Sequence, residues 1–287
     1  MNEHQTDGAV QLADHNVPEL YRSGRLKQQR AKRNRIISYV VGIAVVAFVV
    51  LTGDWAKVGR LYFDLDRAKS VFPDIVTVAA KNTIIYTAGA FIGGVSIGLI
   101  LAVLKMSDLR PYRWFATAYI DVFRGLPALL TILFVGLAAP AAIGIQFPII
   151  FGVDSAGILA LALVAGAYLA ETMRAGIEGV PRGQLEAARS LGMTRAQTMR
   201  IVVVPQAFRI VIPPLTNELV LLLKDTALLY ALGTTPETVE LTKFGKDQFN
   251  LDFNGTPLVV AGVMYLIITI PLTRLVAQLE KRNRVSR

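Results

Sequence analysis

The chain has 287 residues, of which 53% are hydrophobic and 18% are charged, and its mean hydropathy is +0.49. Soluble domains carry about 25% charged residues, so this composition argues against a soluble domain and indicates a membrane protein. Cysteine is absent, which excludes a disulfide framework and thiolate chemistry. Both histidines, His4 and His15, lie in the polar N-terminal tail, which excludes a histidine-based metal or catalytic site in the body of the chain. The net charge of +9 does not indicate nucleic-acid binding, because the basic residues lie at the ends of apolar runs.

Six apolar runs approach the roughly 20 residues that a membrane-spanning helix needs. They cover residues 36–52, 82–104, 114–139, 149–170, 201–223 and 258–277. Arg124 and Pro127 interrupt the third run, and Pro205, Pro213 and Pro214 interrupt the fifth. We therefore predict an all-α integral membrane protein of about six spans, in which prolines break or bend the backbone.

The basic residues are distributed unequally between the two ends of these spans. With both termini on the inner side, the inner segments hold 20 Lys and Arg residues and the outer segments hold 7. Inner loops of membrane proteins are enriched in Lys and Arg, so we place both termini in the cytoplasm. Residues 1–35 form a basic cytoplasmic tail, which we expect to be disordered and to lie against the anionic inner leaflet. The run 36–52 is interpreted as an uncleaved N-terminal anchor, because no small-residue cleavage site follows it.

Two patterns that resemble catalytic motifs do not indicate catalysis. Gly94 and Gly98 frame a G-x-S-x-G sequence, but it lies inside an apolar run where no histidine can reach it. Together with Gly89 and Gly93 they have the four-residue spacing that lets two membrane helices approach closely, so we predict helix packing there. Gly245 precedes a lysine but lacks the other residues of a P-loop, so the chain is not expected to bind ATP in that way.

The segment 180–200 carries the signals of two short helices joined by a tight turn, on the predicted cytoplasmic side. Pro181 suits a first helical turn, and the residues after it are nearly all helix formers. Gly192 fits the left-handed position that ends a helix. Thr194 and Gln197 have the spacing of a capping box, which predicts the start of the next helix.

This helix–turn–helix is a candidate docking element for another protein. Ala187 and Ala188 would give a smooth surface for a partner's groove, and Gly192 would fix the angle between the two helices. Polar contacts at the rim would come from Arg182, Glu186 and Arg189. An ordinary cytoplasmic loop with two amphipathic turns is the alternative, and the spacing alone does not decide between them.

Several motifs, which follow one another along the chain in the order expected for the family, resemble the permease subunits of ABC importers. The run Glu186-Ala187-Ala188, followed by Gly192, Ile201 and Pro205, resembles their EAA loop. Further segments look like the polar amino acid permease subfamily; they lie at residues 123–127, 170–176, 205–207, 213–214, 223–226 and 279–282. The resemblance covers residues 74–282.

The resemblance implies a type I ABC importer transmembrane domain at residues 74–282 with a five-span core, here preceded by the extra span 36–52. It implies that the loop 180–200 is the coupling segment that inserts into an ATPase, with the ATPase-coupling residues Arg182, Glu186, Ala187, Ala188, Arg189 and Gly192. The implied partners are ABC ATPase subunits, a second permease subunit, an extracellular or periplasmic solute-binding protein and the lipid bilayer. ATP and Mg would bind to the partner ATPase, and this chain is expected to have no catalytic residue, metal or cofactor. The implied function is import of an amino acid across the bacterial inner membrane.

Polar residues within the spans are costly and therefore mark functional candidates. Asn217 and Glu218 are the first candidates for the substrate pathway, and Glu171 and Arg124 are the next. The last two can each be neutralised by a residue three positions away on a helix, Arg174 for Glu171 and Asp121 for Arg124.

Two other classes of protein share some of these features. A secondary transporter of small polar solutes, driven by an ion gradient, could have the same number of spans, but it would often show an inverted repeat, and the sequence shows none. A non-transporting scaffold or sensor would have no need for paired prolines and charges within its spans.

Overall fold

The computed structural model describes residues 31–285, which are almost entirely helical, and the chain divides into two units, residues 1–58 and 59–287. Unit 1 contains the apolar helix Ala31–Thr52, which is long enough to cross a membrane. This helix begins before the predicted anchor 36–52, and the first 30 residues of the predicted tail lie outside the described residues. Helix α2 (Trp55–Tyr62) contains the boundary between the two units.

Unit 2 contains four further helical segments of membrane-spanning length and several shorter elements. The long segments are Ile75–Lys105, which includes α4 (Lys81–Lys105); α8 (Ser155–Glu178); Arg195–Leu232, which includes α10 (Arg195–Gln197) and α11 (Val204–Asp225); and α13 (Thr256–Val285). The shorter elements are α3 (Leu65–Ser70), α5 (Arg110–Gly125), α6 (Ala128–Leu133), α7 (Ala139–Ile143), the strands β1 (Ile149–Ile150) and β2 (Val153–Asp154), α9 (Arg182–Ser190) and α12 (Leu241–Asp252).

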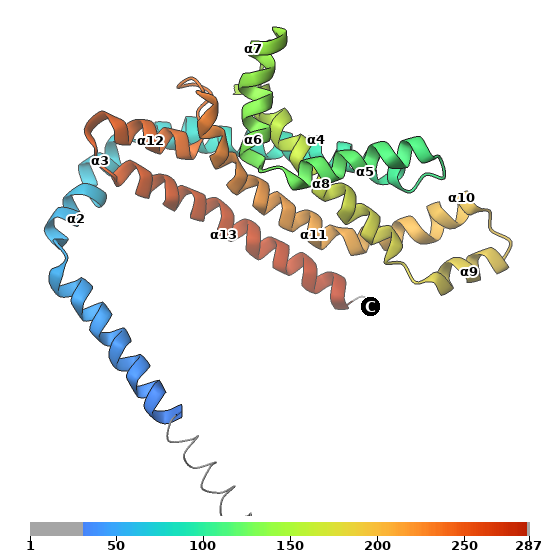
Figure 1. Cartoon of the computed structure of the whole chain (residues 1–287), viewed down its shortest axis with the longest axis horizontal. Helices are drawn as coiled ribbons and strands as arrows, with labels where there is room; N and C mark the ends of the chain where they lie inside the picture. Colours follow the sequence, from blue (N-terminus) through green and yellow to red (C-terminus); the bar gives the residue numbers. More distant parts are fainter. Residues whose placement is uncertain (1–30, 286–287) are drawn as a thin grey trace, which may run out of the picture. The chain divides into compact units, whose positions relative to one another are not determined.

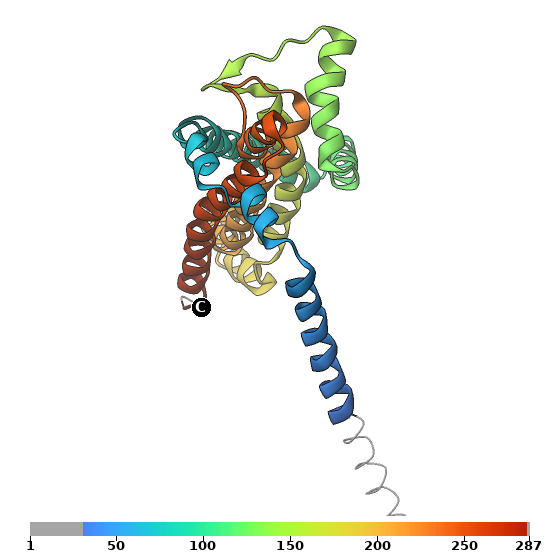
Figure 2. The same ribbon diagram turned by 90° about the vertical axis from the view of Figure 1, so that its left-hand side faces the viewer.

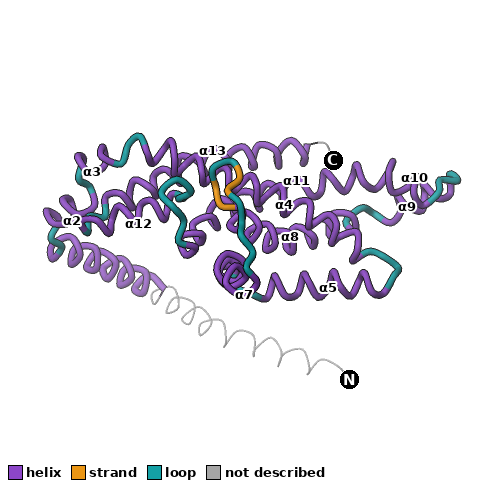
Figure 3. Tube along the Cα trace, turned by 90° about the horizontal axis from the view of Figure 1, so that it is seen from above, coloured by secondary structure: helices purple, strands orange, loops and turns teal. Residues whose placement is uncertain are grey.

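The long helices of unit 2 lie alongside one another, and its two ends carry different elements (Figure 1). The α9–α10 segment and the C-terminus of α13 lie at one end, whereas α3 and α12 lie at the other, and the view from above agrees (Figure 3). The connection between α4 and α5 also lies at the α9–α10 end. The basic segments 105–113 and 174–200 and the described part of the basic segment 274–287, residues 274–285, therefore share one end of the unit, as the charge distribution predicts.

The third predicted span, 114–139, is wrong as a single straight crossing. Residues 110–143 form two helical pieces, Arg110–Gly125 and Ala128–Ile143, which meet at an angle of 106°. Leu126 has an extended backbone (φ −87°, ψ 140°), because the ring of Pro127 disfavours a helical conformation in the residue before it. Figure 3 shows α7 end-on, with α5 running away from its base. The interruption was predicted at the correct place, but the size of the bend was not.

The fourth predicted span, 149–170, has both of its ends misplaced. Residues 149–154 form the antiparallel pair β1–β2, which ends the segment that returns from α7 to the bundle (Figure 2). Asp154 then caps α8, because its carboxylate accepts a hydrogen bond from the Ala156 N–H at 2.8 Å. The helix continues to Glu178 rather than ending at Ala170. The apolar pattern alone therefore misplaced both ends of this helix.

The fifth predicted span is longer than expected, and the prolines do not break it. Helical backbone runs from Arg195 to Leu232 and includes Pro213 and Pro214 in the interior of α11. The six residues before α11 are π-helical, and Pro205 lies just inside the start of α11. A π-helical segment changes the hydrogen-bond spacing where proline lacks an N–H donor, so the helix can continue. The prediction that prolines break or bend this span is therefore wrong as to a break, because the helix is continuous through all three prolines.

Small residues allow α4 and α8 to pack closely, as the glycine spacing predicts. Added Cβ atoms at Gly93 and Gly94 would each lie 2.9 Å from the Cβ of an alanine on α8. A Cβ on Gly98 would lie 2.9 Å from the Leu169 Cβ and 3.0 Å from the Ala170 backbone nitrogen. Close approach of this kind maximises van der Waals contact, which drives helix association in lipid because the hydrophobic effect is absent there. This row of glycines is therefore a packing surface.

A buried polar network joins the helices at the α12 end of the unit. Glu240 is fully buried and caps α12, and its carboxylate accepts hydrogen bonds from the Thr242 and Lys243 backbone N–H groups at 2.6 and 2.7 Å. The Tyr265 hydroxyl of α13 donates to the same carboxylate at 3.0 Å. Burial raises the pKa of Glu240 to about 7, although these donors act in the opposite direction. Asn82 of α4 donates hydrogen bonds to the backbone carbonyls of Glu237 and Val239 and so fixes the position of the loop before α12.

We predict that Gly98→Leu destabilises the bundle by about 1–3 kcal/mol, because the added side chain must displace Leu169 or the backbone of α8. Thermal unfolding of the purified chain in detergent would measure the effect. Gly262→Leu in α13 is the matched control, since a Cβ there meets no atom within 4 Å. Equal unfolding temperatures for the two variants would contradict the predicted packing.

Candidate functional site

The α9–α10 segment has the two helices and the tight turn that the sequence predicts. α9 begins after Pro181, which occupies the position just before the helix rather than the first helical turn. Gly192 follows the helix with φ +82°, a left-handed backbone that glycine adopts without strain. The Met193 N–H donates to the Ala188 carbonyl at 3.1 Å, and the Gly192 N–H donates to the Arg189 carbonyl at 3.0 Å. These bonds satisfy the last carbonyls of α9 and fix the direction of the turn.

The second helix starts with the predicted capping box. The Thr194 hydroxyl accepts from the Gln197 N–H at 3.2 Å, and the Gln197 side-chain oxygen accepts from the Thr194 N–H at 2.8 Å. The helix then continues into α11 without interruption. The turn is therefore connected directly to a membrane-length helix.

The base of this helix–turn–helix is packed against both α8 and α11. Val180, Val203 and Ala207 are buried together, and Ile177 and Leu185 pack against them. Nearby, Gly176 of α8 lies so close to α11 that a Cβ at this position would collide with Val211. Close-packed interiors transmit displacement rather than absorb it. A force on α9 would therefore reach α8 and α11.

The structure divides the six predicted coupling residues between two environments. Arg182, Glu186, Ala187, Arg189 and Gly192 are exposed. Ala188 is only 4% exposed, because it faces the interior of its own chain. The prediction that Ala188 gives part of a docking surface is therefore wrong for this conformation. Leu191, which no motif in the sequence indicated, is 82% exposed beside Gly192.

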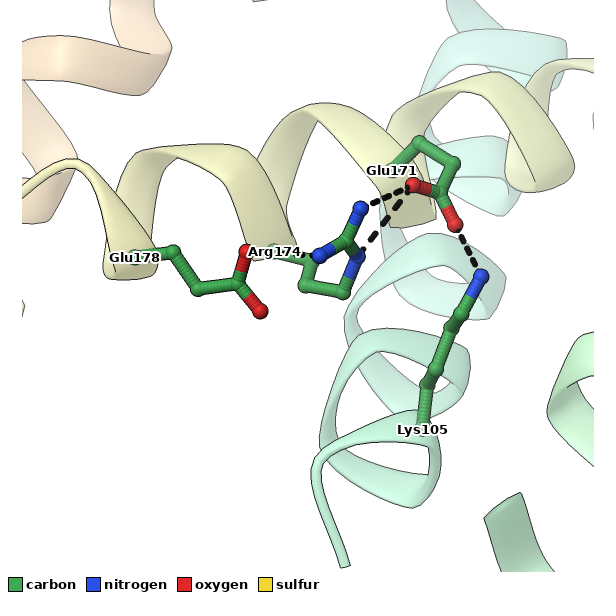
Figure 4. Close-up of polar contacts among 4 residues, drawn as sticks. All are labelled: Lys105, Glu171, Arg174 and Glu178. Carbon is green, nitrogen blue, oxygen red and sulfur yellow. Dashed lines mark hydrogen bonds and ion pairs between the residues drawn. The ribbon is translucent and has the colours of Figure 1, made fainter.

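Glu171, a predicted pathway residue, lies in a cluster of charged side chains (Figure 4). Its carboxylate accepts from the Arg174 guanidinium at 2.7 Å, which confirms the predicted pair, and it also bonds the Lys105 ammonium of α4. Arg174 also contacts Glu178 at 2.6 Å. Because Lys105 and Glu171 belong to different helices, the cluster joins α4 to α8. Lys105 is separated from Glu171 by 66 positions, so no local spacing rule could have found this contact.

A cavity of about 290 Å³ lies between α6, α8 and α11. It is lined by two carboxylates, Glu218 and Asp225, by Tyr168, and by apolar side chains that include Leu161, Val164 and Leu222. The prediction that Glu218 lines a pathway agrees with this position. Asn217, its neighbour, is exposed and does not line the cavity.

Arg124 does not form the predicted ion pair with Asp121 among the described residues. Its guanidinium instead lies over the ring of Tyr168, 5.5 Å from the centroid. This distance permits a cation–π interaction. Since Tyr168 lines the cavity, Arg124 stands close to it although it lies on α5. The sequence pattern gave no signal for Tyr168, because the contact links helices that are far apart in the chain.

The fold is a bundle of membrane-length helices, and the helix–turn–helix α9–α10 is attached to one end of it. Residues 94–285 match the family described as "Binding-protein-dependent transport system inner membrane component". This match covers well over half of the chain, and the chain belongs to this family.

Individual relatives agree with this family. The chain is 37% identical over 209 residues to the arginine transport system permease protein ArgU of Corynebacterium glutamicum. This alignment covers 69% of this chain and 65% of that protein. It is 33% identical over 206 residues to the glutamate/aspartate import permease protein GltK of Escherichia coli. This alignment covers 70% of this chain and 90% of that protein. Among solved structures, an amino acid ABC transporter crystallised with histidines is similar, with 33% identity and a TM-score of 0.69 over 76% of this chain and 98% of that one.

These similarities confirm the type I importer fold and the role of the chain as a permease, which is a transport component. They give no support to the alternative, an ion-gradient-driven secondary transporter. Five apolar helices of sufficient length, together with the bent pair, are consistent with a multi-pass membrane protein.

We predict that Glu171→Gln destabilises unit 2 by about 1–2 kcal/mol, because Lys105 and Arg174 lose a charged partner in a site that is mostly shielded from solvent. Thermal unfolding in detergent would measure the change. Glu178→Gln is the control, because its side chain is 56% exposed and, among the described residues, Arg174 is its only ion-pair partner. A larger loss for Glu178→Gln than for Glu171→Gln would contradict the joining role of Glu171.

Proposed function

We propose that this chain is the membrane subunit of an ATP-driven importer of amino acids, and that α9 with its following turn is the surface that contacts the ATPase. The observation that carries the proposal is the exposed, tightly capped α9–α10 segment, whose base packs on both α8 and α11. ATP and Mg bind to the partner ATPase, since the sequence of this chain contains no P-loop. A solute-binding protein delivers the substrate, and a second permease subunit completes the pathway.

Coupling in this scheme is a shift between two packings of the membrane helices. ATP binding draws the ATPase subunits together and moves each α9. Because α9 is attached through buried contacts to α8 and α11, those two helices move with it. A ligand can shift such an equilibrium only by binding one state better than the other, so the α9 surface must fit the ATPase differently in the two states.

The orientation follows from charge and from the arrangement of the helices. The basic segments at residues 105–113, 174–200 and 274–285 lie at the end of unit 2 that carries α9. Lys and Arg are enriched on the cytoplasmic side, so α9 and both termini face the cytoplasm of the bacterial inner membrane. The α12 end then faces outward, where a solute-binding protein would dock.

An amino acid is the proposed cargo because relatives with more than 30% identity are named as arginine and glutamate/aspartate permeases. The cavity beside Glu218 and Asp225 offers polar groups and a volume suited to a small solute.

Replacing Gly192 should uncouple ATP hydrolysis from uptake. Gly192→Val places a β-branched residue at φ +82°, which forces the turn into another conformation and changes the direction of α9. In proteoliposomes that contain the assembled transporter, we expect at least a tenfold fall in amino acid taken up per ATP hydrolysed.

Gly262→Val, in α13 and away from the α9 surface, is the matched control for this experiment. A Cβ meets no atom within 4 Å at either glycine, but only Gly192 has a positive φ. The control should keep uptake within about twofold of the parent. Full coupling in Gly192→Val would remove the turn from the mechanism.

The orientation can be tested by labelling single cysteines, because the natural chain contains none. We expect Ser190→Cys to react with a membrane-impermeant maleimide only after the cells are opened. Ile145→Cys, in the connection after α7, should react in intact cells. The opposite pattern would reverse the proposed topology.

A further inference from the structure

Glu240 is a fully buried carboxylate to which the transport scheme gives no role. It lies in the loop before α12, outside the helices of membrane-spanning length. It accepts hydrogen bonds from the backbone N–H groups of Thr242 and Lys243 and from the Tyr265 hydroxyl. Among the described side chains, no lysine or arginine forms an ion pair with it. A buried carboxylate that only neutral donors stabilise has a high desolvation cost when it is ionised, so protonation is favoured.

Few titratable groups face Glu240 from the elements packed around it. They are Tyr86 of α4 and Tyr265 of α13, whose hydroxyls are uncharged at neutral pH, and Lys243 of α12. The Lys243 ammonium is paired with Asp247 at 2.6 Å and gives Glu240 no charged partner. The helical segment Ile75–Ala80, which packs beside α12, contains no titratable residue. Other charged or titratable side chains of the surrounding elements are exposed: Lys81, Lys224, Tyr230, Glu237 and Lys246.

The Tyr265 hydroxyl is in contact with three oxygen atoms from different parts of the chain. Its oxygen lies 3.0 Å from the Glu240 carboxylate and 3.4 Å from the Thr226 hydroxyl. It also accepts a hydrogen bond from the Thr242 hydroxyl at 3.2 Å. Thr226 begins the short helical turn that continues α11, and its hydroxyl donates to the Leu223 carbonyl at 2.7 Å. The Thr226 oxygen therefore still has lone pairs with which to accept a hydrogen bond from Tyr265.

These contacts allow two arrangements, because the Tyr265 hydroxyl has a single proton to donate. When Glu240 is ionised, Tyr265 donates to it, and α13 is bonded to the cap of α12. When Glu240 is protonated, its O–H donates to the Tyr265 oxygen, and Tyr265 donates to Thr226. The second arrangement bonds α13 to the end of the helix that contains α11.

We infer that Glu240 is a positioning residue, and that its protonation from the outer medium redirects the Tyr265 hydrogen bond from the cap of α12 to Thr226. The only covalent change is one O–H bond formed on the Glu240 carboxylate, with a proton that the outer medium supplies. Because α9 is packed against α11, the new bond between α13 and the end of α11 opposes the movement of α11 during transport. Acidification outside the membrane therefore slows uptake. This last step rests on the proposed function, whereas the proton-dependent bond does not.

The burial of Glu240 brings this change into the range near neutral pH. Burial raises its pKa from the ordinary value of 4.5 to about 7. Since the folded chain binds this proton more tightly than the unfolded chain, protonation stabilises the fold. This contribution is complete below pH 4.5 and is lost as the pH rises through 7.

Infrared spectroscopy of the purified full-length chain in nanodiscs would test the bond, because a protonated carboxyl group has its own C=O band. Subtracting the spectra of Glu240→Gln from those of the parent should leave a carboxyl band that appears as the pH falls, with a midpoint near pH 7. Tyr265→Phe should move this midpoint to higher pH, because the ionised form loses the stronger, charge-assisted bond. Thr226→Val should move it to lower pH, because the protonated form loses an acceptor. Glu237→Gln, which changes an exposed carboxylate of the same loop, is the matched control and should keep the parent midpoint.

Uptake by the assembled transporter in proteoliposomes, with the inner pH fixed and the outer pH varied, would test the effect on transport. We expect ATP-dependent uptake by the parent to be about threefold slower at an outer pH of 6 than at 8, the effect of one neutral hydrogen bond. The amide of Glu240→Gln can donate to Tyr265 as the protonated acid does, so this variant should be slow at both pH values. Glu237→Gln should respond to outer pH as the parent does.

Two infrared results would overturn the inference: no carboxyl band that depends on Glu240 between about pH 5 and pH 9, or a midpoint that Thr226→Val leaves unchanged or raises. Gel filtration and thermal unfolding would establish the folding of each variant. If Glu240→Gln does not fold, the comparison of the parent with Thr226→Val decides, and identical titrations overturn the inference. ATP-driven uptake that is insensitive to outer pH would overturn only the effect on transport. Absence of ATP-driven uptake in the parent would contradict the proposed function and leave the infrared result standing.

Discussion

The close packing of α8 against its neighbours is the constraint on which the rest of the structure depends. Glycines on α4 leave no room for a Cβ against α8, and Gly176 leaves none against α11. In a bilayer such contacts supply most of the energy that holds helices together, because lipid is as apolar as the side chains it would replace. The charged cluster around Glu171 adds a second connection between α4 and α8.

This packing places the two proposed functional regions on the same pair of helices. The C-terminal end of α8 and the N-terminal end of α11 hold the base of the α9–α10 segment. Tyr168 of α8 and Glu218 and Asp225 of α11 line the cavity. Movement of α9 and a change in the shape of the cavity are therefore connected through continuous helices. A transporter needs this connection, because energy is delivered at one place and the substrate is bound at another.

The sequence predicted the features that depend on neighbouring residues. The turn at Gly192, the capping box at Thr194 and the packing role of the glycines on α4 all follow from short-range rules, and each is confirmed. The position of the break before Pro127 was also predicted, for the same reason. The number of apolar segments could be predicted from the sequence because the length of a span must match the thickness of the hydrocarbon layer.

Features that depend on contacts across the bundle were missed. The Lys105–Glu171 pair and the Arg124–Tyr168 contact join residues that are distant in sequence. The sequence pattern predicted that Ala188 is exposed for docking, but other residues of the same chain bury it. The ends of the fourth and fifth spans were misplaced because hydropathy does not distinguish a strand pair or a proline-containing helix from a plain span.

The central claim is that α9 moves with the ATPase and transmits this motion to the membrane helices. The most direct measurement is the distance between spin labels on Ala187→Cys in the two permease subunits of an assembled transporter, with and without trapped ATP. Labels on Leu251→Cys of α12, at the other end of unit 2, provide the reference. We expect ATP to shorten the distance between the Ala187 labels. This change should be larger than any change in the distance between the Leu251 labels. An unchanged Ala187 distance in a transporter that hydrolyses ATP and imports substrate would contradict it.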